Sequence, residues 1–158
     1  MPIKILKTLY QSLIVPYLTY GIELWFSASN ILTNRVQILQ KKAVRAMNNL
    51  PYNAHTHDFF RDMQLLKLYD LHNVALMTDM YRRVSSSEIP IQAVTTNHDY
   101  NTRNRNLLNT PRFNRTATQN SFVYQQITKW NNIPVDIKEA NNGSKFKMAY
   151  KSYLQSLY

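Results

Sequence analysis

The fold is decided by a helical repeat in residues 32–50, LTNRVQILQKKAVRAMNNL. Its apolar side chains recur every three or four residues, at Leu32, Val36, Leu39, Ala43, Met47 and Leu50. On a helix these positions fall within an arc of about 100°, which predicts an amphipathic helix with one face toward a core. Pro51 ends this helix, because the residue before a proline disfavours helical backbone.

The same kind of pattern predicts helices on both sides of this stretch. Residues 3–27 are apolar on more than one face, which indicates a mostly buried helix that Pro16 kinks or divides. Residues 69–86 carry a broad apolar face and are expected at the centre of the core. Further helices are expected near 58–64, over 119–131 and from 144 to 158. The fold class is therefore mainly α, with about five to six helices.

Residues 87–118 differ in character from the helical stretches around them. Asn is abundant there and Pro90 and Pro111 break helix, so we expect an extended loop or one short hairpin. The chain has 158 residues, a length that suits a single helical domain with its own core. Within it we expect helices over 1–50, a helical scaffold at 51–86, the basic extended segment at 87–118 and C-terminal helices over 119–158.

The charge balance points to a polyanionic partner. Nineteen Lys and Arg face nine Asp and Glu, a net charge of +10. Such a balance favours nucleic acid, although a membrane surface or simple solubility are alternatives. No signal peptide is apparent, and the most apolar run, residues 9–26, contains Pro16 and Glu23 and so should not span a membrane. An intracellular location, in the nucleus or the cytoplasm, is expected.

One group of candidate contacts lies on the helix that opened this section. Lys41, Lys42 and Arg45 are expected on the side of that helix away from its apolar stripe. They could bind backbone phosphates of a nucleic acid. They could equally form an ordinary solvated face, and both readings stay open.

A second basic group combines arginines with an aromatic ring. Its members are Tyr100, Arg103, Arg105, Arg112 and Arg115. Arg offers two parallel donors to a phosphate, and a Tyr ring can stack on an unpaired base. In the alternative interpretation the ring packs in the core, and the arginines cap helix ends or pair with acids.

The sequence offers little for catalysis. Two-metal catalysis needs paired carboxylates, and none of the nine acids is adjacent to another. The absence of Cys excludes thiolate zinc sites and cysteine nucleophiles. His55, His57 and Asp58 form the best metal-like cluster, but Asp58 is more readily explained as a helix cap. No catalytic residue, metal ligand or cofactor is therefore expected in this chain.

Four motifs occur in order along nearly the whole chain. They are LYQSLIVPYLTYG at 9–21 with Trp25, LQKKAVR at 39–45, HDYNTR at 98–103, and WNNIP at 130–134 followed by Phe146-Lys147. Together they resemble the region after the polymerase core in non-LTR retrotransposon reverse transcriptases, in particular the Jockey-like and chicken-repeat-like branches.

This resemblance implies a non-catalytic C-terminal segment of an RNA-directed DNA polymerase. Fingers, palm and the magnesium ions would belong to an upstream core, and residues 1–50 would be thumb-like helices. The expected partners are RNA or an RNA–DNA hybrid and that polymerase core. The alternatives are a structural domain that docks on the core through exposed apolar patches, or a truncated copy without function.

Overall fold

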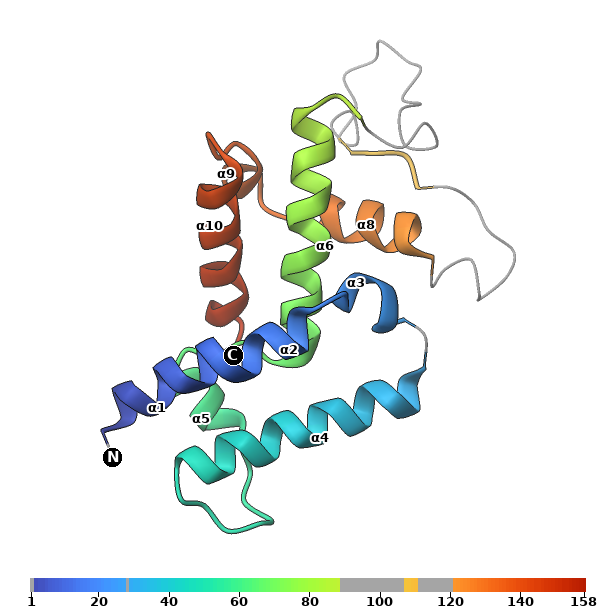
Figure 1. The fold of residues 1–158 in the computed structure, drawn as a ribbon. Coiled ribbons are helices and arrows are strands. Elements are labelled where there is room, and N and C mark those ends of the chain that lie inside the picture. The colour runs from blue at the N-terminus through green and yellow to red at the C-terminus, as the bar shows by residue number, and fades with distance from the viewer. Residues whose placement is uncertain (1, 28, 89–106, 111–120) are drawn as a thin grey trace. The chain divides into compact units, whose positions relative to one another are not determined.

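The computed structural model describes residues 2–27, 29–88, 107–110 and 121–158. These residues are mainly α-helical and contain no strand, so the predicted mainly α fold class is confirmed (Figure 1). None of the helices in these ranges is both long and apolar enough to cross a membrane. Most of the predicted basic extended segment at 87–118, with its possible hairpin, lies outside the described residues.

The N-terminal stretch is a run of short helices rather than one kinked helix. It consists of α1 (Ile3–Leu9), the π-helical turn η1 (Tyr10–Ile14), α2 (Val15–Thr19) and α3 (Ile22–Trp25). Pro16 lies in the first turn of α2 and has no backbone N–H to donate. The wide π-helical turn η1 lies just before it and accommodates this missing hydrogen bond. Gly21, with φ of 59°, then turns the chain into α3.

The expectation that this stretch is mostly buried is wrong. Only Tyr10, Leu18 and Ile22 of it are buried. Leu13 is 58% exposed and Tyr17 is 84% exposed. A sequence with apolar residues on several sides of a helix does not show which sides are packed against other residues. In the N-terminal stretch of this chain, only one side is packed.

Helix α4 (Asn30–Met47) matches the predicted helix in place but not in orientation. Its first turn is capped by Ser29, whose side chain accepts from the Leu32 amide. Leu32 and Leu39 of the predicted stripe are 56% and 60% exposed, whereas Gln40 and Val44 are buried. At about 100° per residue, the direction of the buried Gln40 and Val44 is rotated by roughly 80° from the centre of the predicted apolar stripe. Gln40 is a polar residue and is not part of the predicted apolar stripe.

Two compact units make up the fold, and each is described by itself. The first comprises residues 1–75 with 149–158, and the second comprises residues 76–148. Two helices, α6 (Leu68–Ser85) and α10 (Gly143–Ser156), contribute residues to both. That the chain is a single domain stays a prediction.

The first unit is built around a small apolar cluster. Tyr10, Val44, Phe60, Met63 and Leu65 form it, and Phe60 comes from the short helix α5 (His57–Asp62). Beside it, the buried side-chain amide of Gln40 binds separate segments of the chain. Gln40 Nε2 donates to the hydroxyl of Tyr10 at 2.8 Å and to the carbonyl of Leu66 at 2.9 Å, and Gln40 Oε1 accepts from the amide of Leu68 at 2.9 Å.

The second unit is organised around an aromatic stack. It contains α8 (Phe122–Asn131) and α9 (Val135–Lys138) together with parts of α6 and α10. The fully buried ring of Phe146 stacks on Tyr81 with centroids 4.6 Å apart and lies 5.8 Å from the ring of Trp130. The Tyr81 hydroxyl donates to the carbonyl of Ala140. Trp130 and Phe146, which belong to the closing motif, are therefore core residues.

Asn131 of the same motif also has a structural contact. Its Oδ1 accepts from the amide of Leu108 at 2.9 Å, and its Nδ2 donates to the carbonyl of Leu108 at 2.8 Å. The Asn131 side chain thus forms with Leu108 the same two hydrogen bonds that the backbone of a neighbouring β-strand would form, and it holds residues 107–110 against α8.

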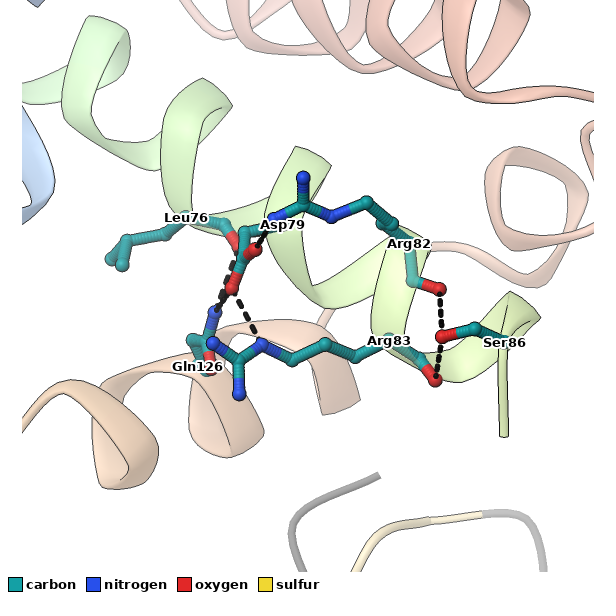
Figure 2. A network of polar contacts seen from close by, with 6 residues as sticks. All are labelled: Leu76, Asp79, Arg82, Arg83, Ser86 and Gln126. Atoms are coloured by element: carbon teal, nitrogen blue, oxygen red, sulfur yellow. Dashed lines mark hydrogen bonds and ion pairs between the residues drawn. The ribbon is translucent and has the colours of Figure 1, made fainter. Parts of the chain in front are cut away.

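A buried carboxylate joins α6 to α8 inside the second unit (Figure 2). Asp79 accepts from Arg82, from Arg83 Nε at 2.7 Å and from Gln126 Nε2 at 2.9 Å. Burial by itself would raise the pKa of Asp79, but the hydrogen bonds from Gln126 and the two arginines outweigh it and hold this pKa below its ordinary value. The charged form of Asp79 is therefore the one that the fold stabilises.

Replacing Asp79 with alanine is expected to lower the free energy of unfolding by about 2 kcal/mol at neutral pH, because Gln126 and two arginines lose a charged acceptor. Because the folded pKa is lowered, this stabilisation is present above the ordinary aspartate pKa of about 3.9 and is lost as pH falls through the folded value. Urea unfolding of both proteins at about pH 7 and about pH 3 measures it, and the difference should shrink in acid.

The matched control is Asp62→Ala, since Asp62 is exposed and pairs only with the exposed Arg61 among the described residues. That variant should unfold almost like the parent protein. A cost at Asp79 that is the same at both pH values would contradict the assignment of the charge.

Candidate nucleic-acid interface

The three predicted cations of α4 differ in their surroundings. Lys42 is exposed and Lys41 is half-buried. Arg45 donates from Nε to the carbonyl of Ala54 at 2.8 Å, so its guanidinium holds the loop between α4 and α5. Arg45 therefore binds a backbone carbonyl. Of these three cations, only Lys41 and Lys42 have no ion pair or hydrogen bond from their charged groups to any described residue.

The second predicted group cannot be placed. Tyr100, Arg103, Arg105, Arg112 and Arg115 all lie outside the described residues. Their contact with nucleic acid stays a prediction.

A cavity of about 240 Å³ lies beside Lys41 in the first unit. It is bordered by α4, by the loop that Arg45 holds and by the segment that leads into α6. Its polar lining consists of Gln37, Lys41, His55, Thr56, His57 and Lys67, and the buried Gln40 and Phe60 also line it. The cavity therefore joins a predicted contact residue to the His-x-His motif that the sequence offered as a weak metal cluster.

The cavity lining is cationic. It contains two lysines and two histidines and no carboxylate. The nearest acid to His57 is the exposed Asp58, with Nδ1 and Oδ1 3.8 Å apart, and Asp58 also faces Arg61 at 3.4 Å. In the described ranges, neither Lys41 nor Lys67 forms an ion pair. No group of three potential metal ligands occurs in these ranges either.

Lys67 is held in place by Tyr158. Its Nζ lies 4.1 Å from the ring centre of Tyr158, and its backbone amide donates to the Tyr158 hydroxyl at 2.9 Å. That hydroxyl in turn donates to Asp70. Burial first, and then this bond to Asp70, raise the pKa of Tyr158, so the phenol stays protonated and neutral near Lys67.

Charge counting along the sequence missed Lys67. Residues 51–88 contain four Lys/Arg and five Asp/Glu, so a sum of charges over this block, which includes the predicted scaffold at 51–86, is close to neutral. In the structure Asp58 and Asp62 pair with Arg61, and Asp79 pairs with Arg82 and Arg83. This local pairing leaves Lys67 as the uncompensated cation of the block, a result that a sum over residues hides.

Part of the chain is similar in sequence to known proteins. The chain is 35% identical over 68 residues to the RNA-directed DNA polymerase from the mobile element jockey of Drosophila melanogaster. It is 32% identical over 65 residues to a probable RNA-directed DNA polymerase from transposon BS of the same organism. The chain is thus similar, over about two fifths of its length, to retrotransposon reverse transcriptases. The resemblance stated from the motifs is therefore confirmed.

The similarity to these reverse transcriptases is partial. The matches cover 42% and 41% of this chain and 7% of each polymerase. No family model matches the chain, and no solved structure matches it. The relationship is thus to a small part of a much longer reverse transcriptase.

Proposed function

We propose that this chain is a non-catalytic segment of a reverse transcriptase that contacts RNA or an RNA–DNA template–primer through the basic surface of its first unit. The observation that carries the proposal is the cationic cavity beside α4, next to the exposed Lys42. Lysine and neutral polar side chains are the usual partners of backbone phosphates, and such contacts do not depend on base sequence.

Polymerisation itself belongs, on this proposal, to a core outside the chain. Three of the described carboxylates, Asp58, Asp62 and Asp79, are engaged with arginines, which suits structural roles better than metal binding. Magnesium would be held by that upstream core, and the segment would work wherever the element's RNA is copied, in the nucleus or the cytoplasm.

The roles of the predicted α4 cations differ within this proposal. Lys41 and Lys42 would contact phosphate directly. Arg45 would act through the loop that carries His55, because its Nε is bound to Ala54. The Arg and Tyr residues at 100–115 would add a second contact surface.

Neutralising both lysines, as Lys41→Gln with Lys42→Gln, is expected to weaken binding to an RNA–DNA hybrid about tenfold or more at low salt. If both contact phosphates, the slope of log affinity against log salt should fall by about 1.8. Fluorescence anisotropy with a labelled hybrid at several salt concentrations measures both quantities. The loss should be similar for unrelated base sequences.

A second double variant, Lys4→Gln with Lys7→Gln on α1, removes the same charge and serves as the control. It should change affinity much less, since these lysines lie outside the cavity lining. An equal loss of affinity in both double variants would mean that net charge, and not the position of the two lysines, causes the effect. Binding that ignores salt would count against the whole proposal.

One observation favours the alternative of a docking domain. Apolar side chains of α2, α3 and α4 are strongly exposed, including Tyr17 at 84%, Tyr20 at 86%, Leu24 at 83% and Ile31 at 68%. Exposed apolar groups on neighbouring elements are typical of protein interfaces. A chain without affinity for the hybrid that still co-purifies with a polymerase core would favour this second function over the first.

A further inference from the structure

We propose that the cavity between α4 and α5 is a subsite for one phosphate group of a nucleic acid backbone. Lys41 and Lys67 would bind the phosphate, and His55 and His57 would strengthen this binding when they are protonated. This inference rests on the proposed function and deepens it, because it names which part of the basic surface receives a phosphate and how pH governs it.

The donors around the cavity converge from separate segments. Lys41 comes from α4, His55 and Thr56 from the loop before α5, His57 from its first turn and Lys67 from the segment before α6. Positive charges that approach from several sides suit a group with several equivalent oxygens, which is the chemistry of phosphate. With no carboxylate in the lining, no negative charge would offset the repulsion between a metal cation and the two lysines.

The size of the cavity fits this ligand. Its volume is about 240 Å³, far above the roughly 10–15 Å³ of cavity that one water requires. A phosphate with part of its sugar can therefore enter with little rearrangement. The buried side chains of Gln40 and Phe60 also line the cavity, so its inner wall belongs to the packed core of the first unit.

The lysine on the far side is preorganised. The ring of Tyr158 lies 4.1 Å below Lys67 Nζ, and the Tyr158 hydroxyl is bonded to the Lys67 amide and to Asp70. Gln155 Nε2 also donates to the carbonyl of Gln64 at 2.7 Å, which fastens the terminal turn. An ammonium that is already ordered loses less conformational entropy when it binds an anion.

The two histidines make the subsite sensitive to pH. Histidine is the side chain that changes its charge between about pH 5 and 8. The charged or titratable groups around this pair are Lys41, Arg45, Asp58, Arg61, Lys67 and Tyr158. A bound phosphate would add a negative charge beside both imidazole rings.

The test is a titration of the full chain followed through the histidine ring protons by NMR. The probe is a dinucleoside monophosphate, because its single phosphodiester keeps the same charge across the range of interest. The signals of His55 and His57 should shift and saturate, and the buried His72 should not respond. Affinity should be about threefold or more tighter near pH 6 than near pH 8.

Two variants with the same change of charge decide where the phosphate binds. Lys67→Gln should abolish the saturable shift, while the unchanged signals of His72 and Trp130 report an intact fold. Lys4→Gln removes an exposed cation on α1, outside the cavity lining, and should leave the shift unchanged. A saturable shift that survives Lys67→Gln, or one that Lys4→Gln removes equally, overturns the subsite.

A further arm separates free phosphate from nucleic acid phosphate. Inorganic phosphate near pH 7 should produce the same pattern of shifts more weakly than the dinucleoside monophosphate, whose sugars add contacts. Tighter binding of inorganic phosphate would overturn the assignment to a nucleic acid backbone. Salt-dependent binding of the hybrid without any shift of the His55 and His57 signals would contradict the subsite alone. An absence of hybrid binding together with an intact shift of these signals would contradict the proposed function.

Discussion

Replacing Gln40 with leucine is expected to lower the free energy of unfolding of the first unit by about 4 kcal/mol. The change keeps the side chain's approximate volume but strands the Tyr10 hydroxyl, the Leu66 carbonyl and the Leu68 amide, and each buried unsatisfied group costs about 1–3 kcal/mol. All three residues are less than a tenth exposed. Chemical denaturation followed by far-ultraviolet circular dichroism measures the loss.

Three related variants show whether hydrogen bonding causes this loss. Gln37→Leu, one turn earlier and half-buried, should cost little. Gln40→Glu should also destabilise, because a carboxylate cannot donate to Tyr10 or Leu66. Combining Gln40→Leu with Tyr10→Phe should cost less than the sum of the two, because the pair is then removed together. A cost below about 1 kcal/mol for Gln40→Leu would show that water replaces these bonds.

Truncating Phe146 to alanine is expected to cost about 4 kcal/mol in the second unit. The ring is fully buried, stacks on Tyr81 and lies tilted beside Trp130, so its removal leaves a cavity where three aromatic rings meet. Urea unfolding followed by tryptophan fluorescence measures the cost, since Trp130 lies next to the lost ring.

The control lies two residues along the same helix. Met148 is 70% exposed, and Met148→Ala should change stability by only a few tenths of a kcal/mol. Phe146→Leu should fall between the two, because it fills part of the space. Equal unfolding of the Phe146→Ala and Met148→Ala variants would mean that the aromatic stack does not hold this unit together.

These expectations bear on the meaning of the closing motif. Trp130, Asn131 and Phe146 all make internal contacts in the second unit. The motif that supports the relationship to reverse transcriptases therefore maintains a fold. The direct candidates for nucleic acid lie elsewhere, around α4 and its cavity.

Much of the local structure followed from the sequence. The repeat in residues 32–50 and Pro51 located α4 to within a few residues, because helical periodicity and proline act through local backbone geometry. The mainly α class followed for the same reason. The absence of an adjacent pair of acids was equally visible without coordinates.

The orientation of α4 did not follow, and Gln40 is the reason. Hydropathy treats glutamine as polar and assigns it to the solvent side. A glutamine with three internal hydrogen bonds can be buried, but its partners Tyr10, Leu66 and Leu68 are about thirty residues away on either side. No local pattern contains that information.

The sequence by itself determined that this chain is helical, strongly basic and related to reverse transcriptases, because periodicity, net charge and ordered motifs are properties of the chain alone. It also singled out Lys41. Only the tertiary structure decided that Lys41 shares a cavity with His55, His57 and Lys67, and that Arg45 serves the neighbouring loop. The physical reason is that a site for an anion needs charges to converge in space and to remain unpaired, and both conditions depend on which distant residues the fold brings together.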